Sequence, residues 1–321
     1  MAYTVVVSDD KTAHVETERE ALLAFVDAEV RHVAAHDEDT LIEAASGADA
    51  LIVDASTPVT ERVLDALDLS VVGRAGIGVD NVALDAAAER GVSVVHVPDY
   101  CLDEVATHAL SLLLACARGH PQYAAGTARG EWDVPAAAPL HRLSGSTLGL
   151  LAFGNIPRRL LDFAAGYNFE VLCHDPYVDD ATMEARGVEP VVFEDLLDRA
   201  ELLSLHAPLT DDTRGIIDAE AFAAMQDGAV LVNTARGGLV DIAALRDALD
   251  DGTVATAGLD VLPEEPPTDS SLAARDDVIV TPHAGWYSEE SQTELRRKVA
   301  ADVGRVLAGA APRAPVSADR W

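Results

Sequence analysis

Three segments of the chain carry polar side chains that could act together on a carbonyl group. In chain order they contain Arg236 in Asn-Thr-Ala-Arg-Gly-Gly, Glu265 in Pro-Glu-Glu-Pro-Pro, and His283 in Thr-Pro-His-Ala-Gly. An arginine fork can hold a substrate carboxylate at both oxygens. A histidine can donate a proton where negative charge develops on an oxygen, and a neighbouring carboxylate keeps a histidine protonated at higher pH. The trio is therefore suited to the reduction of a small keto acid.

Each of the three residues also has a plainer interpretation. Arg236 could pair with a structural acid such as Asp241. Glu265 could belong to an acidic surface loop, and a lone histidine such as His283 is more often structural than catalytic. Their order favours the catalytic interpretation, because each follows a short apolar run that is typical of a buried strand. Ligands of open α/β sheets bind at the carboxyl ends of such strands.

A cofactor site is indicated upstream, where the apolar run 148–153 is followed by Gly154. Only this middle glycine of a Gly-x-Gly-x-x-Gly fingerprint is present, since Ala152 and Pro157 occupy the outer positions. A glycine there lets the backbone approach a pyrophosphate at a helix N-terminus. Asp175 ends the next apolar run about 20 residues on, where a carboxylate binds ribose hydroxyls and repels a 2′-phosphate. We therefore expect NAD rather than NADP, although Asp175 could instead cap a turn.

These segments need elements that place them at one edge of a sheet. Apolar runs alternate with amphipathic helical patterns, which predicts parallel sheets flanked by helices. The expected strands are 3–7, 50–53, 71–75, 92–97, 148–153, 170–174, 202–205, 229–233, 255–260 and 278–281. The expected helices are 18–28, 59–67, 82–90, 102–118 and 289–307. The segments 266–267 and 310–315 are expected to be linker-like, and the C-terminal tail is expected to be loose.

Length and charge narrow the class of protein. The chain has 321 residues, 49% of them hydrophobic, so two α/β domains are the natural expectation. Its formal net charge is −32, with acids spread along the whole chain and only Lys11 and Lys298 as lysines. Spread acids repel one another unless salt screens them, so we expect adaptation to high salt, with an ordinary acidic protein as the alternative. Such a charge argues against nucleic acid and anionic membranes as partners.

Cysteine usage and the N-terminus bear on location. Cys101, Cys116 and Cys173 form an odd set without metal-ligand spacing, which favours a reducing compartment and predicts no metal site. The first residues are typical of a strand rather than of a signal peptide, and no apolar run reaches membrane-spanning length. These features predict a cytoplasmic protein.

Together these segments resemble the D-isomer-specific 2-hydroxyacid dehydrogenases over nearly the whole chain. The resemblance implies an NAD-dependent oxidoreductase acting on the CH–OH group of donors, which transfers hydride between nicotinamide and C2 of a small 2-keto or D-2-hydroxy acid. It makes Arg236 the catalytic arginine, Glu265 the partner of the histidine, and His283 the acid/base.

The resemblance also implies binding residues. Those for the cofactor are Gly154, Asn155, Ile156, Asp175, His206, Ala207, Pro208, Thr234, Ala235 and Asp260, the last at the nicotinamide carboxamide. In Arg-Ala-Gly-Ile-Gly-Val-Asp-Asn, Arg74, Ile77 and Gly78 would contact the substrate acid. The segments 97–101 and 283–288 are similar to the C-terminal-binding-protein-like branch, in which Trp286 would wall the substrate pocket; packing at a domain joint is the alternative.

The implied architecture consists of two doubly wound parallel-sheet domains of the α/β class. A Rossmann dinucleotide-binding domain, residues 100–287, is inserted into a discontinuous, flavodoxin-like substrate domain made of residues 1–99 plus 288–321. Residues 102–118 would form the dimerisation helix of a homodimer.

Three residues depart from the family pattern, and two other functions are alternatives. Ala152 and Pro157 put cofactor affinity and nucleotide preference in doubt, and Thr107 stands where the family commonly has an acid before His108. A 3-phosphoglycerate dehydrogenase would need a basic patch for the substrate phosphate, yet beyond Arg74 the pocket-forming segments show little positive charge. A non-enzymatic NAD-sensing binding protein suits the branch resemblance and the altered fingerprint, but has no need of an intact trio.

Overall fold

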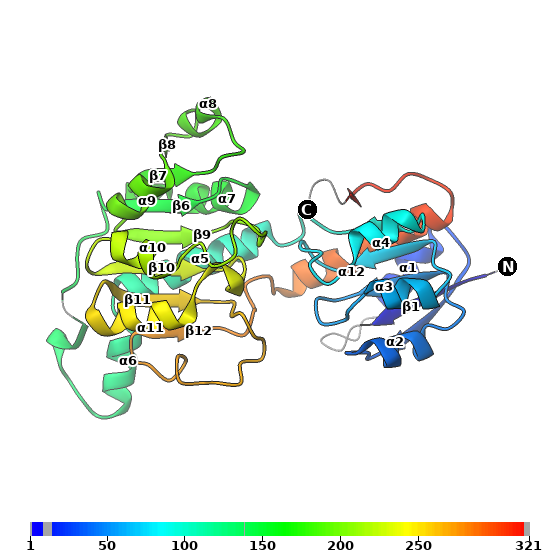
Figure 1. Cartoon of the computed structure of the whole chain (residues 1–321), viewed down its shortest axis with the longest axis horizontal. Coiled ribbons are helices and arrows are strands. Elements are labelled where there is room, and N and C mark those ends of the chain that lie inside the picture. Colours follow the sequence, from blue (N-terminus) through cyan, green and yellow to red (C-terminus); the bar gives the residue numbers. More distant parts are fainter. Residues whose placement is uncertain (1, 9–14, 138, 318–321) are drawn as a thin grey trace. The chain divides into compact units, whose positions relative to one another are not determined.

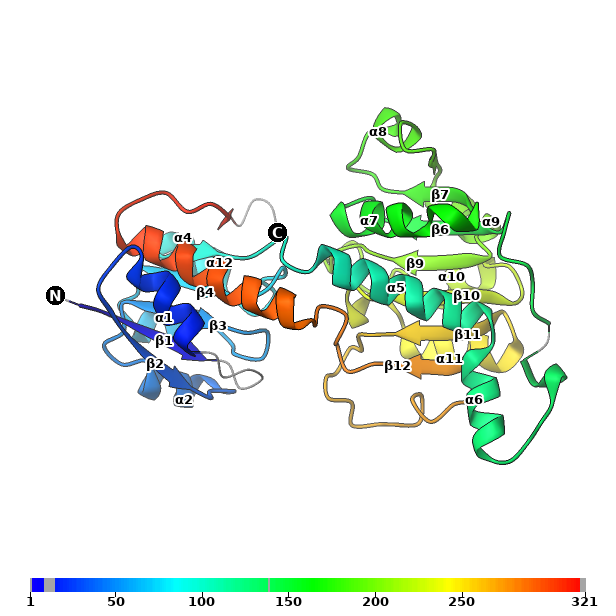
Figure 2. The same cartoon turned by 180° about the vertical axis from the view of Figure 1, so that it is seen from behind.

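The chain folds into two compact units, each an α/β structure. The computed structural model describes residues 2–8, 15–137 and 139–317. Unit 1 consists of Met1–Tyr100 and Ser288–Trp321, and unit 2 of Cys101–Tyr287. Figures 1 and 2 show the elements of each unit from opposite sides.

Unit 1 contains a six-stranded sheet in the order β2-β1-β3-β4-β5-β13. The strands are β1 (Tyr3–Ser8), β2 (Ala28–Val33), β3 (Ala50–Val53), β4 (Val71–Arg74), β5 (Ser93–Val95) and β13 (Pro315–Val316). The first five are parallel, and β13 pairs antiparallel with β5. The order 2-1-3-4-5 is that of the flavodoxin-like folds, as the sequence predicts.

Helices cover both faces of this sheet. One face carries α2 (Glu38–Ala44), α3 (Glu61–Ala66) and α4 (Leu84–Glu89), and the other carries α1 (Val15–Leu23) and α12 (Glu289–Leu307) (Figures 1 and 2). Gly73 in β4 lets α12 approach closely, since a Cβ there would lie 2.6 Å from Val303 and 2.9 Å from Val299. Arg296 of α12 forms a buried ion pair with Glu18 of α1 at 2.5 Å. The C-terminal helix is therefore part of the core of the N-terminal unit.

Unit 2 contains a seven-stranded parallel sheet in the order β12-β11-β10-β9-β6-β7-β8. The strands are β6 (Thr147–Leu151), β7 (Glu170–His174), β8 (Glu189–Pro190), β9 (Leu202–Leu205), β10 (Ala229–Asn233), β11 (Val254–Leu259) and β12 (Val278–Val280). The strands β7 and β8 extend the sheet beyond β6 on one side, and β10, β11 and β12 extend it beyond β9 on the other. This is the Rossmann order, and its switch point lies between β6 and β9.

Two layers of helices enclose this second sheet. α5 (Leu102–Ala117) and α7 (Asn155–Ala164) pack together on one face, while α9 (Phe193–Arg199), α10 (Ala219–Ala224) and α11 (Ile242–Asp251) cover the other (Figures 1 and 2). The remaining helical segments are α6 (His120–Ala128), α8 (Asp180–Glu184) and the 3-10 turns η1 (Val134–Ala137), η2 (Ala165–Tyr167) and η3 (Gly237–Leu239). The predicted fold class, two doubly wound α/β structures, is confirmed.

Two predictions about elements are wrong. The helix expected at 18–28 ends at Leu23, and its last predicted residue already belongs to β2, a partly exposed strand without a continuous apolar run. The segment 313–316, part of the expected linker and tail, is held because the N–H groups of Arg313 and Ala314 donate to Asp302 and β13 pairs with β5, whereas 318–321 lie outside the described residues. Neither feature follows from hydrophobic periodicity.

Candidate active site

The three predicted catalytic residues follow three adjacent strands of unit 2. Arg236 comes after β10, Glu265 after β11 and His283 after β12, and these strands are neighbours in the parallel sheet. Carboxyl ends of parallel strands meet at one edge, where ligands of such sheets bind. The topology therefore brings the three segments to one place.

A hydrogen-bonded turn shapes the Arg236 segment. The side chain of Asn233 accepts from the N–H of Ala235 at 3.0 Å and donates to the carbonyl of Arg236 at 2.8 Å. Gly237 then lies against the acidic segment, since a Cβ there would stand 1.9 Å from the carbonyl carbon of Leu262. Only glycine permits this approach of two backbones, which holds the arginine segment beside the glutamate segment.

Glu265 and His283 form a direct pair. The Nδ1 atom of His283 lies 2.7 Å from Glu265 Oε2, and the other carboxylate oxygen accepts from the N–H of Leu262 at 2.9 Å. Burial raises the pKa of Glu265, but the hydrogen bond and the charge of His283 outweigh it, so the pKa of Glu265 lies below its usual value. The carboxylate is therefore ionised at neutral pH, and His283 Nδ1–H donates to it. The predicted acid–histidine pairing is present in the structure.

Asp260 holds the loop that carries His283. Its carboxylate accepts from Thr281 Oγ1 at 2.6 Å, from the N–H of Ala284 at 2.8 Å and from the N–H of Gly285 at 2.9 Å. Burial raises the pKa of Asp260, but hydrogen bonds from His108, Thr281 and these two backbone groups lower it to about 2. The backbone of His283, in the left-handed region at φ 53°, donates to the Asp260 carbonyl at 2.8 Å. Asp260 thus anchors the histidine loop, a role the sequence did not reveal.

The predicted cofactor turn has the shape that a pyrophosphate needs. Gly154 precedes α7, and among the described residues no atom beyond its two chain neighbours lies within 4 Å of the position of a Cβ there. The first N–H groups of a helix have no partner within it, so Asn155 and Ile156 present donors, whereas Pro157 has none. Ala152 adopts φ 79°, the left-handed conformation for which the fingerprint places glycine.

Other predicted cofactor residues gather around this turn. Asp175 accepts from the N–H of Phe153 and from the N–H of Tyr177, both at 2.8 Å, which fixes its carboxylate beside the fingerprint turn. The N–H of His206 donates to the carbonyl of Leu151 at 2.9 Å, so the segment with Ala207 and Pro208 adjoins the end of β6. Burial lowers the pKa of His206 well below its ordinary value, which leaves a neutral ring.

Thr234 provides an independent sign of a ligand. Its Oγ1 atom is buried and has no hydrogen-bond partner among the residues that the structure describes. Buried hydroxyls without partners are rare in folded proteins. The open space at Gly154, the donors of α7, the Asp175 carboxylate and this hydroxyl together fit a bound dinucleotide.

The predicted substrate residues are divided between the units. Arg74, Ile77 and Gly78 lie in unit 1, and Trp286 lies in unit 2, where its ring meets that of Tyr287 edge-on at 5.6 Å. Arg74 is buried and donates to the carbonyl of Ala75 at 2.6 Å and to Asn81 at 3.4 Å. These bonds show Arg74 shaping its own loop.

The same loop is held from a second side. His96 Nδ1 lies 2.7 Å from the carbonyl oxygen of Ile77, and the N–H of Val97 donates to the Gly76 carbonyl at 2.9 Å. Gly76 has φ 148°, and a Cβ there would stand 1.6 Å from Arg74 Nη1. The backbone of Ile77 and Gly78 is therefore fixed in its turn by His96 and Val97 as well as by Arg74.

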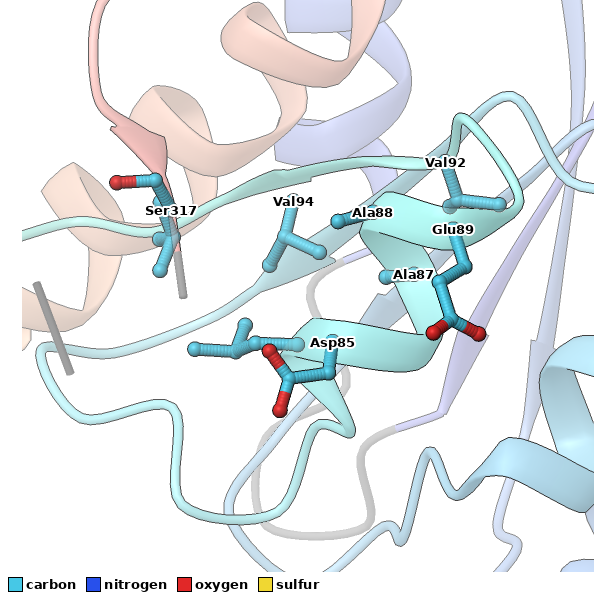
Figure 3. Close-up of a pocket in the computed structure, with 9 residues that line it drawn as sticks. Asp85, Ala87, Ala88, Glu89, Val92, Val94 and Ser317 are labelled. Carbon is cyan, nitrogen blue, oxygen red and sulfur yellow. The ribbon is translucent and has the colours of Figure 1, made fainter. Parts of the chain in front are cut away.

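A pocket in unit 1 lies apart from the predicted residues. It is lined by α4, β5 and β13, with Val92, Val94 and Val316 on its walls and Asp85 and Glu89 beside them (Figure 3). Within the described part of the chain, no three acidic, histidine or cysteine side chains cluster to hold a metal ion. No described helix is long and apolar enough to cross a bilayer.

A Rossmann sheet with a dinucleotide-shaped turn, and an acid–histidine pair at the same edge, define the class of nicotinamide-dependent oxidoreductases. Comparison with known proteins is more specific. Residues 110–285 match the family model described as "D-isomer specific 2-hydroxyacid dehydrogenase, NAD binding domain". The chain belongs to this family, as the sequence motifs predict, and the matching domain binds NAD.

Curated relatives of the chain carry names for different activities. A D-3-phosphoglycerate dehydrogenase of Methanocaldococcus jannaschii is 41% identical over 274 residues, which cover 85% of this chain and 52% of that protein. A hydroxypyruvate reductase of Thermotoga maritima is 37% identical over 276 residues, which cover 84% and 89%. The chain spans about half the length of the curated phosphoglycerate dehydrogenases it matches.

Solved structures agree over the whole chain. A glyoxylate reductase from Paecilomyes thermophila has a TM-score of 0.88 at 27% identity, covering 100% of this chain and 99% of that one. A D-lactate dehydrogenase from Aquifex aeolicus, complexed with NAD and lactic acid, has a TM-score of 0.85 at 26% identity and covers 95% and 96%.

Proposed function

We propose that the protein is an NAD-dependent D-2-hydroxyacid dehydrogenase that reduces small 2-keto acids. The observation that carries this proposal is the 2.7 Å hydrogen bond between His283 Nδ1 and Glu265 Oε2, at the sheet edge that also presents Arg236. Oxidoreductases of this kind need an acid/base and a carboxylate-binding cation at the reacting carbon, beside the nicotinamide.

The residues divide the chemistry between them. Bound NADH supplies the hydride, and the protein provides alignment and proton transfer. Because Glu265 holds Nδ1–H of the His283 ring, Nε2–H is the proton left to transfer to the substrate oxygen. Arg236 binds the substrate carboxylate and stabilises the negative charge that develops during reduction. In the opposite direction, neutral His283 accepts the hydroxyl proton at Nε2.

Small acids are the substrates that the relatives suggest. The relative from Thermotoga maritima is named for hydroxypyruvate, and the two solved structures described above are named for glyoxylate and D-lactate. In unit 1 the hydrogen-bonded loop at Ile77 and Gly78 has backbone N–H groups suited to an acid, and in unit 2 the ring of Trp286 is suited to form an apolar wall. Arg74 orders that loop in this proposal rather than binding the acid as its main role.

A substrate screen tests the proposal. NADH and NADPH are first titrated into the protein in molar KCl, and reduction of glyoxylate, pyruvate, hydroxypyruvate and longer keto acids is then followed at saturating nucleotide. His283→Gln is expected to lower kcat by about 10²–10⁴ while NADH binding is kept, because the general acid is lost. If the folded wild-type protein binds NADH but reduces none of these acids faster than His283→Gln does, the dehydrogenase assignment is disproved.

A second candidate is 3-phosphoglycerate dehydrogenase. The relative from Methanocaldococcus jannaschii, 41% identical, supports it. Including 3-phosphohydroxypyruvate in the screen distinguishes the two candidate functions. A site that binds the substrate phosphate would raise kcat/KM for this acid well above that for hydroxypyruvate. Equal values for the two acids would favour the general 2-keto acid reductase.

We propose that the protein is a homodimer. The surface that supports this proposal differs from the helix 102–118 that the family resemblance implies. The apolar length of α5 is explained by its packing in unit 2, where Ala109, Leu113 and Cys116 are buried against the sheet. The better candidate surface follows α6, where Trp132 is 94% exposed and Val134 79% exposed. Contiguous exposed apolar patches mark interaction sites, and these two large side chains lie only two residues apart in the chain. Light scattering of Trp132→Glu should show monomers where the wild type is dimeric.

We further propose a cytoplasmic location and adaptation to high salt. The buried thiols of Cys101, Cys116 and Cys173 suit a reducing compartment. The net charge of −32 is the basis for expecting adaptation to high salt, and the use of arginine for nearly every positively charged side chain supports this interpretation. Many of these arginines form ion pairs, as Arg275 does with Asp250 and Asp277.

A further inference from the structure

His108 occupies the second turn of α5 and points to the loop of the catalytic histidine. Its Nε2 atom lies 3.0 Å from Thr281 Oγ1 and 3.3 Å from Asp260 Oδ1. Thr281 donates its own hydroxyl proton to Asp260, so the threonine oxygen can only accept from the ring. The ring therefore carries its proton on Nε2 and donates into this pair.

The position of His108 is set by the register between α5 and β11. Leu112 and Cys116 follow it at intervals of four residues, on the same face of the helix. A Cβ at Gly258 would lie 3.0 Å from Leu112 and 3.3 Å from Cys116, so the helix rests directly on this strand. Four helical residues and two strand residues each advance about 6 Å. The helix thus delivers His108 to Asp260 just beyond the end of β11.

Gly285 completes the arrangement. A Cβ at this residue would stand 2.8 Å from Asp260 Oδ2 and 3.2 Å from His108 Cδ2. The imidazole ring therefore packs against the backbone that Asp260 holds by the N–H groups of Ala284 and Gly285. His283 lies between Thr281 and these two residues, so both sides of the catalytic histidine are bound to one carboxylate.

We propose that His108 is a positioning residue for His283, acting through Thr281 and Asp260. It joins the first helix of unit 2 to the last loop of that unit and fixes the Asp260 rotamer that holds the loop. This inference rests on the proposed function for its effect on turnover. Its structural part, the immobilisation of residues 281–285, is independent of any activity.

The test compares His108→Leu with His108→Gln. Leucine fills the space without a donor, whereas the amide nitrogen of glutamine can take the place of Nε2. Thr107→Ala is the matched control, because Thr107 lies on the same helix and its hydroxyl bonds to the Asp103 and Glu104 carbonyls of its own helix. If His108→Leu fails to fold, Thr281→Val against Thr281→Ser tests the same chain of bonds.

Two readouts are expected to change together. Hydrogen exchange of the Ala284 and Gly285 amides becomes faster in His108→Leu, and kcat falls by about 10- to 100-fold, the size of effect that misplacing a catalytic group produces. His108→Gln restores most of the slow exchange and most of kcat. Wild-type exchange and kcat in His108→Leu, or a glutamine variant no better than leucine, would overturn the proposal.

Failure of the proposed function gives a different pattern. A wild-type protein that reduces no keto acid would refute the dehydrogenase, while the exchange rates of Ala284 and Gly285 would still decide whether His108 holds the loop. Altered exchange with unaltered kcat would show that the loop tolerates motion, and it would overturn the positioning role alone.

Discussion

At the scale of single residues, Ala152 shows how the cofactor turn keeps its shape without its first glycine. Its backbone has φ 79°, a region that L-residues avoid because Cβ crowds the following carbonyl. The residue is held there by a short bridge, since its N–H donates to the carbonyl of His174 at 2.9 Å. The surrounding sheet therefore imposes a conformation that the side chain disfavours.

Restoring the glycine should stabilise the protein. Ala152→Gly removes about 1–2 kcal/mol of backbone strain, partly offset by the greater freedom of glycine in the unfolded chain, for a net gain of about 0.5–1 kcal/mol. Urea unfolding in molar KCl measures this gain, and NADH titration should show binding at least as tight as in the wild type. Ala223→Gly, at an exposed helical position, is the control and should lose about 1 kcal/mol.

At the scale of elements, the active-site edge depends on loops that touch one another. Gly237 meets the Leu262 backbone, and Asp260 binds the loop after β12. Each of these contacts joins the end of one strand to the end of its neighbour. A change at either contact should therefore act on the catalytic geometry more than on the sheet.

Adjacent glycines allow a sharp comparison. A Cβ at Gly237 would lie 1.9 Å from the Leu262 backbone, whereas a Cβ at Gly238 would meet the end of the Leu209 side chain at 2.9 Å. A flexible side chain can move aside, whereas the Leu262 backbone is held by its hydrogen bond to Glu265, so Gly237→Ala should lower kcat/KM by at least about 10²-fold and Gly238→Ala far less. Equal losses in the two variants would contradict the contact-based explanation.

The Asp260 carboxylate predicts a pH dependence of stability. Its pKa falls from 3.8 to about 2 on folding, which corresponds to roughly 2 kcal/mol of stabilisation. Because the folded pKa is the lower one, this stabilisation is complete above pH 4 and disappears as the pH falls towards 2. The difference in unfolding free energy between wild type and Asp260→Asn should therefore narrow over that range. Urea titrations from pH 6 to pH 3 measure it, and a constant difference would contradict this account.

Several features were accessible from the sequence because they depend on local order. Arg236, Glu265 and His283 each follow an apolar run, and parallel strands that alternate with helices place their ends together. The bond from His108 to Asp260 was not accessible, because it depends on the register of a helix on a strand about 150 positions away in the chain. The strand β2 was missed for another reason: half-exposed edge strands lack a continuous apolar run.

At the scale of the whole molecule, the main feature is the large excess of negative charge. Acidic residues number 55 against 23 lysines and arginines, and exposed ion pairs such as those of Arg62 with Glu38 and Asp39 compensate only part of the excess. Individual surface pairs contribute little, so the excess acts mainly as a repulsion distributed over the surface.

Stability should therefore rise with salt. Raising KCl from 0.1 to 2 M screens the acidic surface and should increase Tm, with most of the gain at the lower concentrations, where the screening length falls most steeply. Sucrose at matched osmolality is the control, since it strengthens burial without screening charge. A Tm that follows sucrose as closely as KCl would show that repulsion is not what limits stability.

The discontinuity of unit 1 has a consequence for synthesis. Domains usually fold in the order in which they leave the ribosome. Here β1 to β5 emerge first, but α12, whose Val299 and Val303 cover Gly73 of β4, is made only after all of unit 2. The unit synthesised later is contiguous and can close at once, while the face of the earlier sheet that carries α1 still lacks α12. The first part of the polypeptide to be made is therefore the last to be completed, and the part of its sheet at Gly73 is covered only when α12 has been made.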